Sequence, residues 1–242
     1  MSLLLHGDCL DEMKGIDTDS VDFIFCDLPY GQTSCKWDCK IDLEKFWLEM
    51  MRVKKINTPI FMTTTTKFGV SLINSAPKKC PFRYDLVWVK SAPAGFLSAK
   101  KMPMRKHEMV YVFYEKLPFY DLSSHTHKFI KEGIRKDKHK TTYGENIHYH
   151  NNQQKNGESI YDPPLPTTML EIKSTRGKHS TEKPVALMEW LLKYYSKEGD
   201  VVLDPTMGSG STGIACKNMN RNFIGIELDP EIYEVAVNRI EP

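Results

Sequence analysis

The stretch VVLDPTMGSGSTGIAC, residues 201–216, decides the fold, because a short apolar run leads there into a glycine-rich turn and the start of a helix. Glycines in such a turn let the backbone approach a ligand closely, and the first turn of a helix presents unpaired N–H groups at the positive end of its dipole. The lysine of a P-loop is absent, which excludes a phosphate site of that type. The stretch therefore predicts a cofactor-binding loop after a buried strand.

The same glycines also fit a dinucleotide-binding pattern. Gly208, Gly210 and Gly213 match G-x-G-x-x-G, and Glu227 ends the next apolar run, where an acid can hold ribose hydroxyls. A nicotinamide oxidoreductase is therefore an alternative. Only about thirty residues follow Gly213, however, which is room for one strand and one helix. The rest of the sheet must come from upstream, and this order indicates a permuted α/β domain.

Further strands are predicted where short apolar segments alternate with helical patterns. These segments are SLLLHGD (2–8), VDFIFCDL (21–28), TPIFMTT (58–64), YDLVWVK (84–90), HEMVYVFYE (107–115), DVVLDP (200–205) and NFIGIEL (222–228). Their alternation with helical segments at both ends of the chain predicts a parallel α/β sheet.

Two helices are predicted in the last third of the chain. In HSTEKPVALMEWLLKYYSKEGD (179–200), Ser180 or Thr181 can cap the start, Pro184 suits the first turn and Gly199 can end the helix. In LDPEIYEVAVNRI (228–240), Asp229 is the expected N-cap and Pro230 the first helical residue.

The strand pattern fails between about residues 116 and 178, where His, Lys, Asn, Gln, Gly and Pro dominate. We interpret this segment as an insertion or small subdomain. The net charge of the chain is only +2, but residues 90–140 hold twelve Lys or Arg against five Asp or Glu. That local excess favours a surface that faces phosphates, with an ordinary solvated surface as the alternative.

A second polar strand end lies early in the chain, at DLPYG, residues 27–31. The run from Val21 to Cys26 is apolar on both alternating faces, as in a buried parallel strand, and Pro29 and Gly31 stop it. Open α/β sheets bind ligands at the carboxyl ends of their strands. The glycine turn and DLPYG are therefore expected to line one cleft.

Composition bounds the class of protein. With 242 residues and 40% hydrophobic content, the chain can form one globular unit. No apolar window reaches the roughly 18 residues of a membrane span, and the opening segment does not resemble a signal peptide, so we expect a cytoplasmic protein. Six scattered cysteines indicate reduced thiols, and Cys35 with Cys39 forms at most half a zinc site. We predict no metal.

These blocks, in this order, resemble the permuted β-class amino-methyltransferases of DNA, including small methylases of phages and bacteria. The resembling blocks are HGDCLDEM, DLPYG, YDLVWVK, HEMVYVF, HSTEKP, LDPTMGSGSTG and FIGIELDPEIYEVA. The resemblance implies a Rossmann-like, mostly parallel, circularly permuted sheet of the seven-stranded type. It further implies a catalytic half (1–115), a target-recognition insert (116–178) and a cofactor-binding half (179–242).

The resemblance also implies the reaction, in which S-adenosylmethionine methylates an exocyclic amine of a flipped-out base. The Asp27 carboxylate and the carbonyl of Leu28 or Pro29 would accept the amine hydrogens, and Tyr30 would stack on the base. Leu28 departs from the commonest family form, which has proline there. The leading aspartate favours adenine N6 over cytosine N4.

For S-adenosylmethionine, the resemblance implies a set of binding residues distributed over both strand ends. Asp8 and the backbone of Cys9 would lie at the adenine ring, and Glu227 at the ribose. Thr181 and Lys183 would lie near the methionine carboxylate. The residues along the methionine moiety would be Asp204, Met207, Gly208, Ser209 and Gly210.

The sequence thus predicts a sequence-specific N6-adenine DNA methyltransferase. The alternatives are an N4-cytosine methyltransferase and a protein that binds cofactor and DNA but has lost transfer through Leu28. Residues 90–140 would contact phosphates and residues 116–178 would read base edges of double-stranded DNA at a short site. The resemblance allows a homodimer and a cognate restriction endonuclease as partners. His107 and Glu108 are expected to play a structural role.

Overall fold

A computed structural model of the chain describes residues 1–29, 41–131, 158–174 and 182–241. The chain divides into two compact units. One comprises Met1–Asp121 together with Thr168–Pro242, and the other is Leu122–Thr167.

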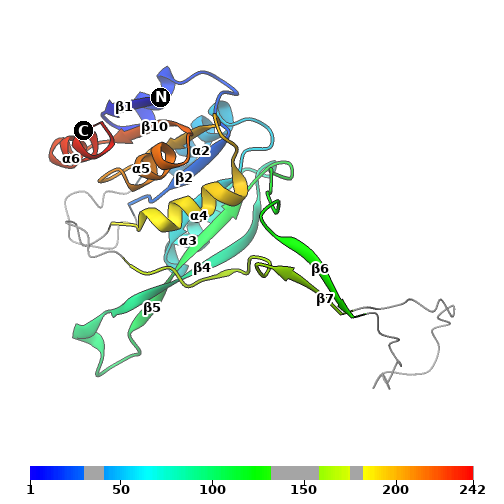
Figure 1. Cartoon of the computed structure of the whole chain (residues 1–242). Coiled ribbons are helices and arrows are strands. Elements are labelled where there is room, and N and C mark those ends of the chain that lie inside the picture. The colour runs from blue at the N-terminus through cyan, green and yellow to red at the C-terminus, as the bar shows by residue number, and fades with distance from the viewer. Residues whose placement is uncertain (30–40, 132–157, 175–181, 242) are drawn as a thin grey trace, which may run out of the picture. The chain divides into compact units, whose positions relative to one another are not determined.

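The larger unit is built on a sheet of eight strands, in the order β1-β10-β9-β2-β3-β5-β4-β8 (Figure 1). The strands are β1 (Ser2–His6), β2 (Phe23–Cys26), β3 (Ile60–Thr64), β4 (Phe82–Ala94), β5 (Arg105–Phe113), β8 (Met169–Leu170), β9 (Val201–Asp204) and β10 (Asn222–Glu227). All seven apolar segments predicted as strands are strands. The eighth, β8, has two residues and pairs with β4 at the edge of the sheet.

Most neighbouring strands run parallel. β1, β10, β9, β2 and β3 form parallel pairs, and β4 is parallel to β8, whereas β5 is antiparallel to both β3 and β4. The predicted mostly parallel sheet is confirmed, and β5 is its antiparallel strand, because β4 and β5 form a hairpin. The carboxyl ends of β1, β2, β3, β4, β9 and β10 consequently lie at one edge of the sheet. The circular permutation stays a prediction.

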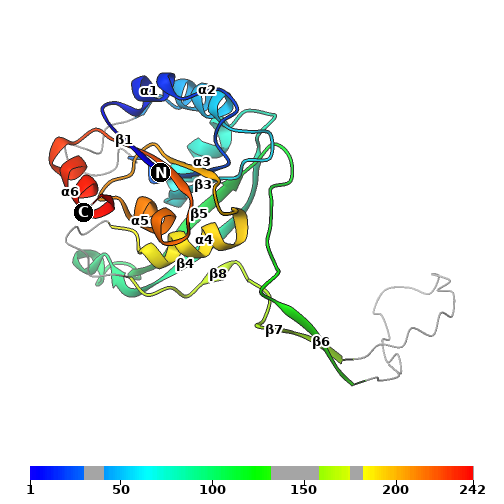
Figure 2. The ribbon, with the colours of Figure 1, turned by 45° about the horizontal axis from the view of Figure 1, so that its top comes forward.

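Helices cover both faces of this sheet (Figure 2). On one face are α1 (Cys9–Glu12), α2 (Leu43–Val53) and α3 (Thr66–Ser75); on the other are α4 (Val185–Tyr195), α5 (Ser211–Asn218) and α6 (Pro230–Ile240). Two 3-10 turns, η1 (Met13–Gly15) and η2 (Phe96–Ser98), follow α1 and β4.

The side chains of β2 alternate between these two layers. Ile24 belongs to the buried cluster that contains Trp47 of α2. Phe23 points to the other face, where it stacks on Phe61 of β3, with ring centroids 5.1 Å apart, and Phe61 in turn meets the edge of the Tyr195 ring of α4. Burial on both faces explains why this strand is apolar at every position.

The two helices predicted near the end of the chain are present. In α6, the Asp229 carboxylate accepts from the backbone N–H groups of the second and third helical residues, and Pro230 is the first, as expected. In α4, Pro184 is the N-cap residue and gives no side-chain cap; Ser180 and Thr181 lie outside the described residues. The prediction that Gly199 ends α4 is wrong, because the helix already ends at Tyr195.

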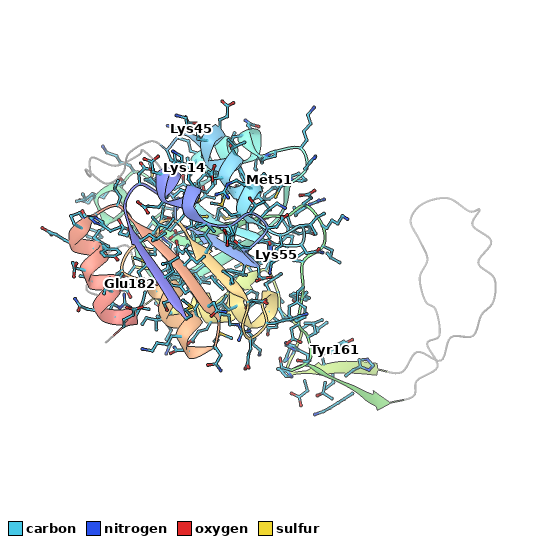
Figure 3. The ribbon with its side chains drawn as sticks, turned by 90° about the horizontal axis from the view of Figure 1, so that it is seen from above. Lys14, Lys45, Met51, Lys55, Tyr161 and Glu182 are labelled. Carbon is cyan, nitrogen blue, oxygen red and sulfur yellow. The ribbon has the colours of Figure 1, made fainter. Side chains whose placement is uncertain are left out.

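The smaller unit contains a hairpin of β6 (Thr126–Lys131) and β7 (Glu158–Asp162). Tyr161 lies on β7 (Figure 3), and its ring packs against His127 across the hairpin, with centroids 4.9 Å apart. This unit falls within the segment where the strand pattern fails.

Among the described residues, no helix is long and apolar enough to cross a membrane. Four cysteines, Cys9, Cys26, Cys80 and Cys216, are free thiols, while Cys35 and Cys39 lie outside the described part of the chain. The described His, Cys, Asp and Glu side chains form no group of three or more that could hold a metal ion.

Candidate active site

The two polar strand ends lie next to each other at the carboxyl edge of the sheet. Asp27 directly follows β2, and the glycine turn directly follows β9, which is the parallel neighbour of β2. The backbone N–H of Asp27 donates to the Thr206 hydroxyl oxygen at 3.2 Å, which joins the two turns directly. Residues far apart in the chain therefore share one site.

The Asp27 carboxylate is held between two donors. The Thr63 hydroxyl, at the end of β3, donates to one oxygen, and the Lys183 ammonium donates to the other at 2.5 Å. The Asp27 side chain is 28% exposed, so the carboxylate is fixed in place and partly accessible to solvent. A fixed, accessible acceptor of this kind can position a hydrogen-bond donor of a substrate.

The residues that follow Asp27 anchor the turn. The side chain of Leu28 is buried in the hydrophobic core, and Pro29 is partly buried. Tyr30 and Trp37 lie outside the described residues. Leu28 therefore contributes an apolar anchor through its side chain, while its peptide carbonyl belongs to the turn.

Lys183 belongs to a chain of alternating charges. Its ammonium lies 3.1 Å from one oxygen of Glu108, and the Lys90 ammonium lies 2.6 Å from the other. Burial by itself lowers the pKa of Lys183, but the carboxylates of Asp27 and Glu108 outweigh it, and the pKa is raised. Burial by itself raises the pKa of Glu108, but Lys183 and Lys90 outweigh it, and the pKa is lowered. Lys183 and Glu108 therefore both stay charged at neutral pH.

The glycine turn has the backbone that only glycine adopts easily. Gly208 and Gly210 have φ of +53° and +85°, in the left-handed region. A Cβ on Gly210 would also lie 2.9 Å from the Ile240 side chain of α6. The carbonyl and hydroxyl oxygens of Ser209 both accept from Arg239, at 2.6 and 2.8 Å. The turn is thus held tightly against α6.

Two acidic residues lie at the carboxyl ends of neighbouring strands: Glu227 is the last residue of β10, and Asp8 follows β1 by two residues. Glu227 accepts from the backbone N–H of Gly208 through one oxygen and from that of Asp229 through the other, both at 2.9 Å. Asp8 caps α1 by accepting from the backbone N–H of Leu10 at 2.8 Å, and Cys9 is the first residue of that helix. Each carboxylate oxygen has two lone pairs, so these acids can also accept from a ligand's hydroxyl or amino groups.

Asp204 lies beneath the turn and is buried. It accepts from the Thr212 hydroxyl at 2.6 Å and from the Thr206 backbone N–H at 3.1 Å. Burial raises the pKa of this carboxyl to about 7, although both hydrogen bonds oppose the rise. Met207 is also buried, and its backbone N–H donates to the Ile226 carbonyl at 2.9 Å. The observed contacts of Asp204 hold the turn to the first part of α5.

A further ion pair, between Glu182 and Arg239, is connected to the glycine turn. The Glu182 carboxylate (Figure 3) accepts from Arg239 at 2.8 Å and from the Ser211 hydroxyl at 3.3 Å. Because Arg239 also holds Ser209, Glu182 connects the segment before α4 to the glycine turn. Thr181, its neighbour in the chain, lies outside the described residues.

The structure adds residues that the sequence did not single out for this site. Thr63 and Lys90 were not considered, and Glu108 was expected only to be structural. Lys183 was expected at a cofactor carboxylate, and in this structure it pairs with Asp27 and Glu108. The signal for Glu108 was a single acid inside the apolar strand HEMVYVF, which requires a buried partner of opposite charge.

Comparisons with known proteins agree on one family. The model of the N6_N4_Mtase family, described as DNA methylase, matches residues 21–238. The type II methyltransferase M.HinfI of Haemophilus influenzae is 28% identical over 99% of this chain and 68% of its own length. The DNA adenine methyltransferase YhdJ of Escherichia coli K12 is 27% identical over 98% of this chain and 82% of its own.

Solved structures share the fold. A crystal structure of the M1.HpyAVI–SAM complex has a TM-score of 0.65 and 23% identity, covering 99% of this chain and 100% of that one. The cytosine-N4-specific PvuII DNA methyltransferase has a TM-score of 0.69 and 13% identity, covering 100% of this chain and 86% of that one. The fold is therefore the Rossmann-like sheet of DNA methyltransferases. Because the family model spans nine tenths of the sequence, this chain belongs to the DNA methylase family.

Proposed function

We propose that this DNA methylase transfers the methyl group of S-adenosylmethionine to the N6 amine of an adenine that is turned out of the duplex. The observation that carries the proposal is the Asp27 carboxylate, which Thr63 and Lys183 hold beside the glycine turn in a partly exposed position.

Methyl transfer to an exocyclic amine requires accurate positioning of the amine nitrogen more than it requires a strong base. An exocyclic amine is a weak nucleophile because its lone pair is delocalised into the ring of the base. Asp27, held in place by Lys183, can accept one amine hydrogen, and the carbonyl of Leu28 or Pro29 can accept the other. These acceptors aim the nitrogen lone pair and stabilise the positive charge that develops as the new N–C bond forms.

The residues around the glycine turn suit S-adenosylmethionine. This molecule supplies an electrophilic sulfonium methyl together with ribose hydroxyls, an adenine amine and an amino acid group. Glu227 ends β10 and Asp8 follows the adjacent strand β1, and these acids can accept from the ribose and the adenine. The left-handed turn at Gly208 and Gly210 allows close approach of the methionine moiety, with Asp204, Met207 and Ser209 along it. Thr181 and Lys183 remain assigned to the methionine carboxylate.

Two observations support adenine as the target. The catalytic turn begins with aspartate, and a relative of near full coverage is named a DNA adenine methyltransferase. N4-cytosine is the second candidate, supported by the fold of the PvuII enzyme. The impaired binding protein finds less support, because Leu28 is buried as an anchor and leaves the acceptor carbonyls in the turn.

DNA is the substrate that the family implies, and the finer assignments are part of the proposal. The segment 116–178 reads base edges at a short double-stranded site, and residues 90–140 contact phosphates. A homodimer and a cognate restriction endonuclease are predicted partners.

The decisive experiment incubates the purified protein with unmethylated bacterial genomic DNA and methyl-labelled S-adenosylmethionine. Nucleosides are then separated by mass spectrometry, and long-read sequencing locates the modified bases. Label in N6-methyladenine at one short motif is the expected result, and Asp27→Asn is the matched inactive control. Label in N4-methylcytosine would show that cytosine, not adenine, is the target base. Cofactor binding without any label would favour a protein that binds cofactor and DNA but transfers no methyl group.

A further inference from the structure

A short arm extends from the sheet where β4 and β5 continue past the end of β3 (Figure 1). β3 ends at Thr64, which lies opposite Met109 of β5. Beyond that level β5 pairs only with β4, while β4 pairs with β8 as far as Trp88 and Ser91 still exchanges hydrogen bonds with Ser174. Past Ser91, η2 lies in the connection between the two strands. We call residues 91–106 the arm.

The arm starts at the active site. Glu108, two residues after the arm, contacts Lys183, which contacts Asp27; Lys90, just before the arm, completes the network. Because β4 is parallel to β2, the arm leaves the sheet at the same edge as the catalytic turn. The arm and Asp27 therefore face the same substrate.

The arm is also short. A register shift in β4 places Ala94 opposite Arg105, only two positions of β5 beyond the pair of Val89 and His107. At about 3.4 Å per residue, the tip of the arm lies on the order of 15 Å from Glu108, which is about four base-pair steps of DNA. The tip can therefore reach the duplex close to the target base.

The tip of the arm is apolar and exposed. Phe96 is 82% exposed, and Leu97 is fully exposed, at 100%. Both belong to η2, after the left-handed Gly95 that turns the chain. Large apolar side chains on a protruding turn mark a contact with a partner, because leaving them in water is unfavourable.

The charged residues of the arm indicate which kind of partner it contacts. Residues 91–107 contain no Asp or Glu, and they contain four basic residues, Lys100, Lys101, Arg105 and Lys106, all of them exposed. Apolar side chains at the tip suit the stacked bases of DNA, and the basic residues next to them suit the phosphates on either side of those bases. A second copy of this chain would instead bring two positive arms together.

We propose that the arm enters the DNA beside the target base and that Phe96 and Leu97 insert between bases as an apolar wedge. This rests on the proposed function, which makes DNA the substrate. Lys100 and Lys101 contact the flanking phosphates. Turning a base out of the duplex leaves its neighbours unstacked, and the wedge fills the gap with apolar surface.

The test uses DNA topology, because side chains that insert between bases unwind the duplex whatever the recognition site is. A relaxed closed plasmid is treated with topoisomerase I under saturating protein, and its linking number is measured after the protein is removed. The tip variant is Phe96→Ser with Leu97→Ser. The matched control is Leu48→Ser with Val70→Ser, which changes exposed apolar side chains on α2 and α3.

We expect the wild type and the control to shift the linking number equally. The tip variant should lose at least half of that shift and about tenfold or more of the methylation rate on genomic DNA, with unchanged melting temperature. Lys100→Gln with Lys101→Gln should keep the shift at saturation but lower the salt slope of DNA binding by about two.

Three results would overturn the wedge. The tip variant could match the wild type in topology, DNA affinity and rate. It could turn a dimer into a monomer in light scattering with topology unchanged, which would assign the tip to a second copy. The tip variant could bind DNA as the wild type does but no longer bind phosphatidylserine vesicles, which would show that the tip contacts lipid. A wild type that transfers no label would refute the proposed function, while the topology assay would still report on the arm.

Discussion

The Lys183 ammonium lies 2.5 Å from the Asp27 carboxylate, although 156 positions separate the two residues in the chain. Lys183 precedes α4 on one side of the sheet, and Asp27 follows β2 at its carboxyl edge. The contact therefore joins the segment HSTEKP to the catalytic turn. Together with the Thr63 hydroxyl, it holds the Asp27 carboxylate, which we propose to be catalytic, in one orientation.

Asp27→Asn should abolish methyl transfer while cofactor binding persists. The substitution keeps the shape of the side chain but removes the negative charge that accepts the amine hydrogen, and a loss of about 100-fold or more in kcat is expected. Transfer is measured with labelled S-adenosylmethionine and genomic DNA, and cofactor binding by calorimetry. Normal methylation by this variant would show that the assigned mechanism is wrong.

Lys183→Met should misalign Asp27 and slow transfer by about tenfold to a hundredfold in kcat. Removing the ammonium also takes away one of the two lysines that lower the pKa of Glu108, so the acid limb of the kcat profile should move to higher pH. Lys183→Arg keeps the charge and should retain more activity. The control Lys193→Met changes an exposed lysine of α4. If the pH profile of Lys183→Met does not shift, Lys183 does not act on the charge of the neighbouring carboxylates. Its role would then be to hold the structure or to bind the cofactor.

Glu227→Gln should weaken S-adenosylmethionine binding without disturbing the arm or the Asp27 network. The charged acceptor for the ribose hydroxyls is lost, which corresponds to about 1.5 kcal/mol or an increase in Kd of roughly tenfold. Calorimetry measures the Kd, and Glu234→Gln, on the exposed side of α6, is the matched control. An unchanged Kd would remove Glu227 from the ribose.

The strands and the glycine turn could be predicted because their signals are local. Apolar runs of four to nine residues and glycines at fixed spacing are visible in any short window, and the ends of β2 and β9 followed from them. The strand β8 could not be predicted, because two residues are too few to show the alternation of apolar and polar side chains that marks a strand. The sequence predicts the end of α4 too late, because Ser196, where the helix has ended, is held by a distant residue: Arg221 donates to its hydroxyl oxygen at 3.0 Å and to its carbonyl at 2.9 Å.

The ion network could not be predicted because its partners are chosen by the fold. The sequence shows that Lys183, Glu108 and Asp27 are charged, but their meeting requires β2, β5 and the segment before α4 to converge at one edge. The closeness of the two strand ends was predictable, since parallel strands share an edge. The partner of a given charge was not, because many charged residues lie at similar distances along the chain.

Gly210→Ala should destabilise the protein, since the residue has φ of +85° and a Cβ there would lie 2.9 Å from Ile240. The left-handed backbone alone disfavours alanine by about 1–2 kcal/mol, and this lowers the melting temperature of a chain of this size by roughly 2–8 °C. Gly15→Ala is the control, because a Cβ at Gly15 meets nothing within 4 Å. Equal melting temperatures for both variants would show that the turn relaxes.

Glu108→Gln should change how stability depends on acidity. The pKa of Glu108 is lowered in the folded protein, so its ion pairs stabilise the fold above the ordinary value of 4.5. That contribution is lost as the pH falls through the lower, folded value. At pH 7 the variant should be less stable by about 1–3 kcal/mol.

The difference between the wild type and Glu108→Gln should then shrink as the pH falls below 4.5, because protonation removes the same charge from the wild type. Urea unfolding at a series of pH values measures this, and Glu198→Gln, an exposed acid after α4, serves as the control. A gap between wild type and variant that stays constant from pH 7 down to pH 3 would mean that Glu108 stabilises the fold by packing alone. The lysine pair would then have no part in holding the base of the arm to the active site.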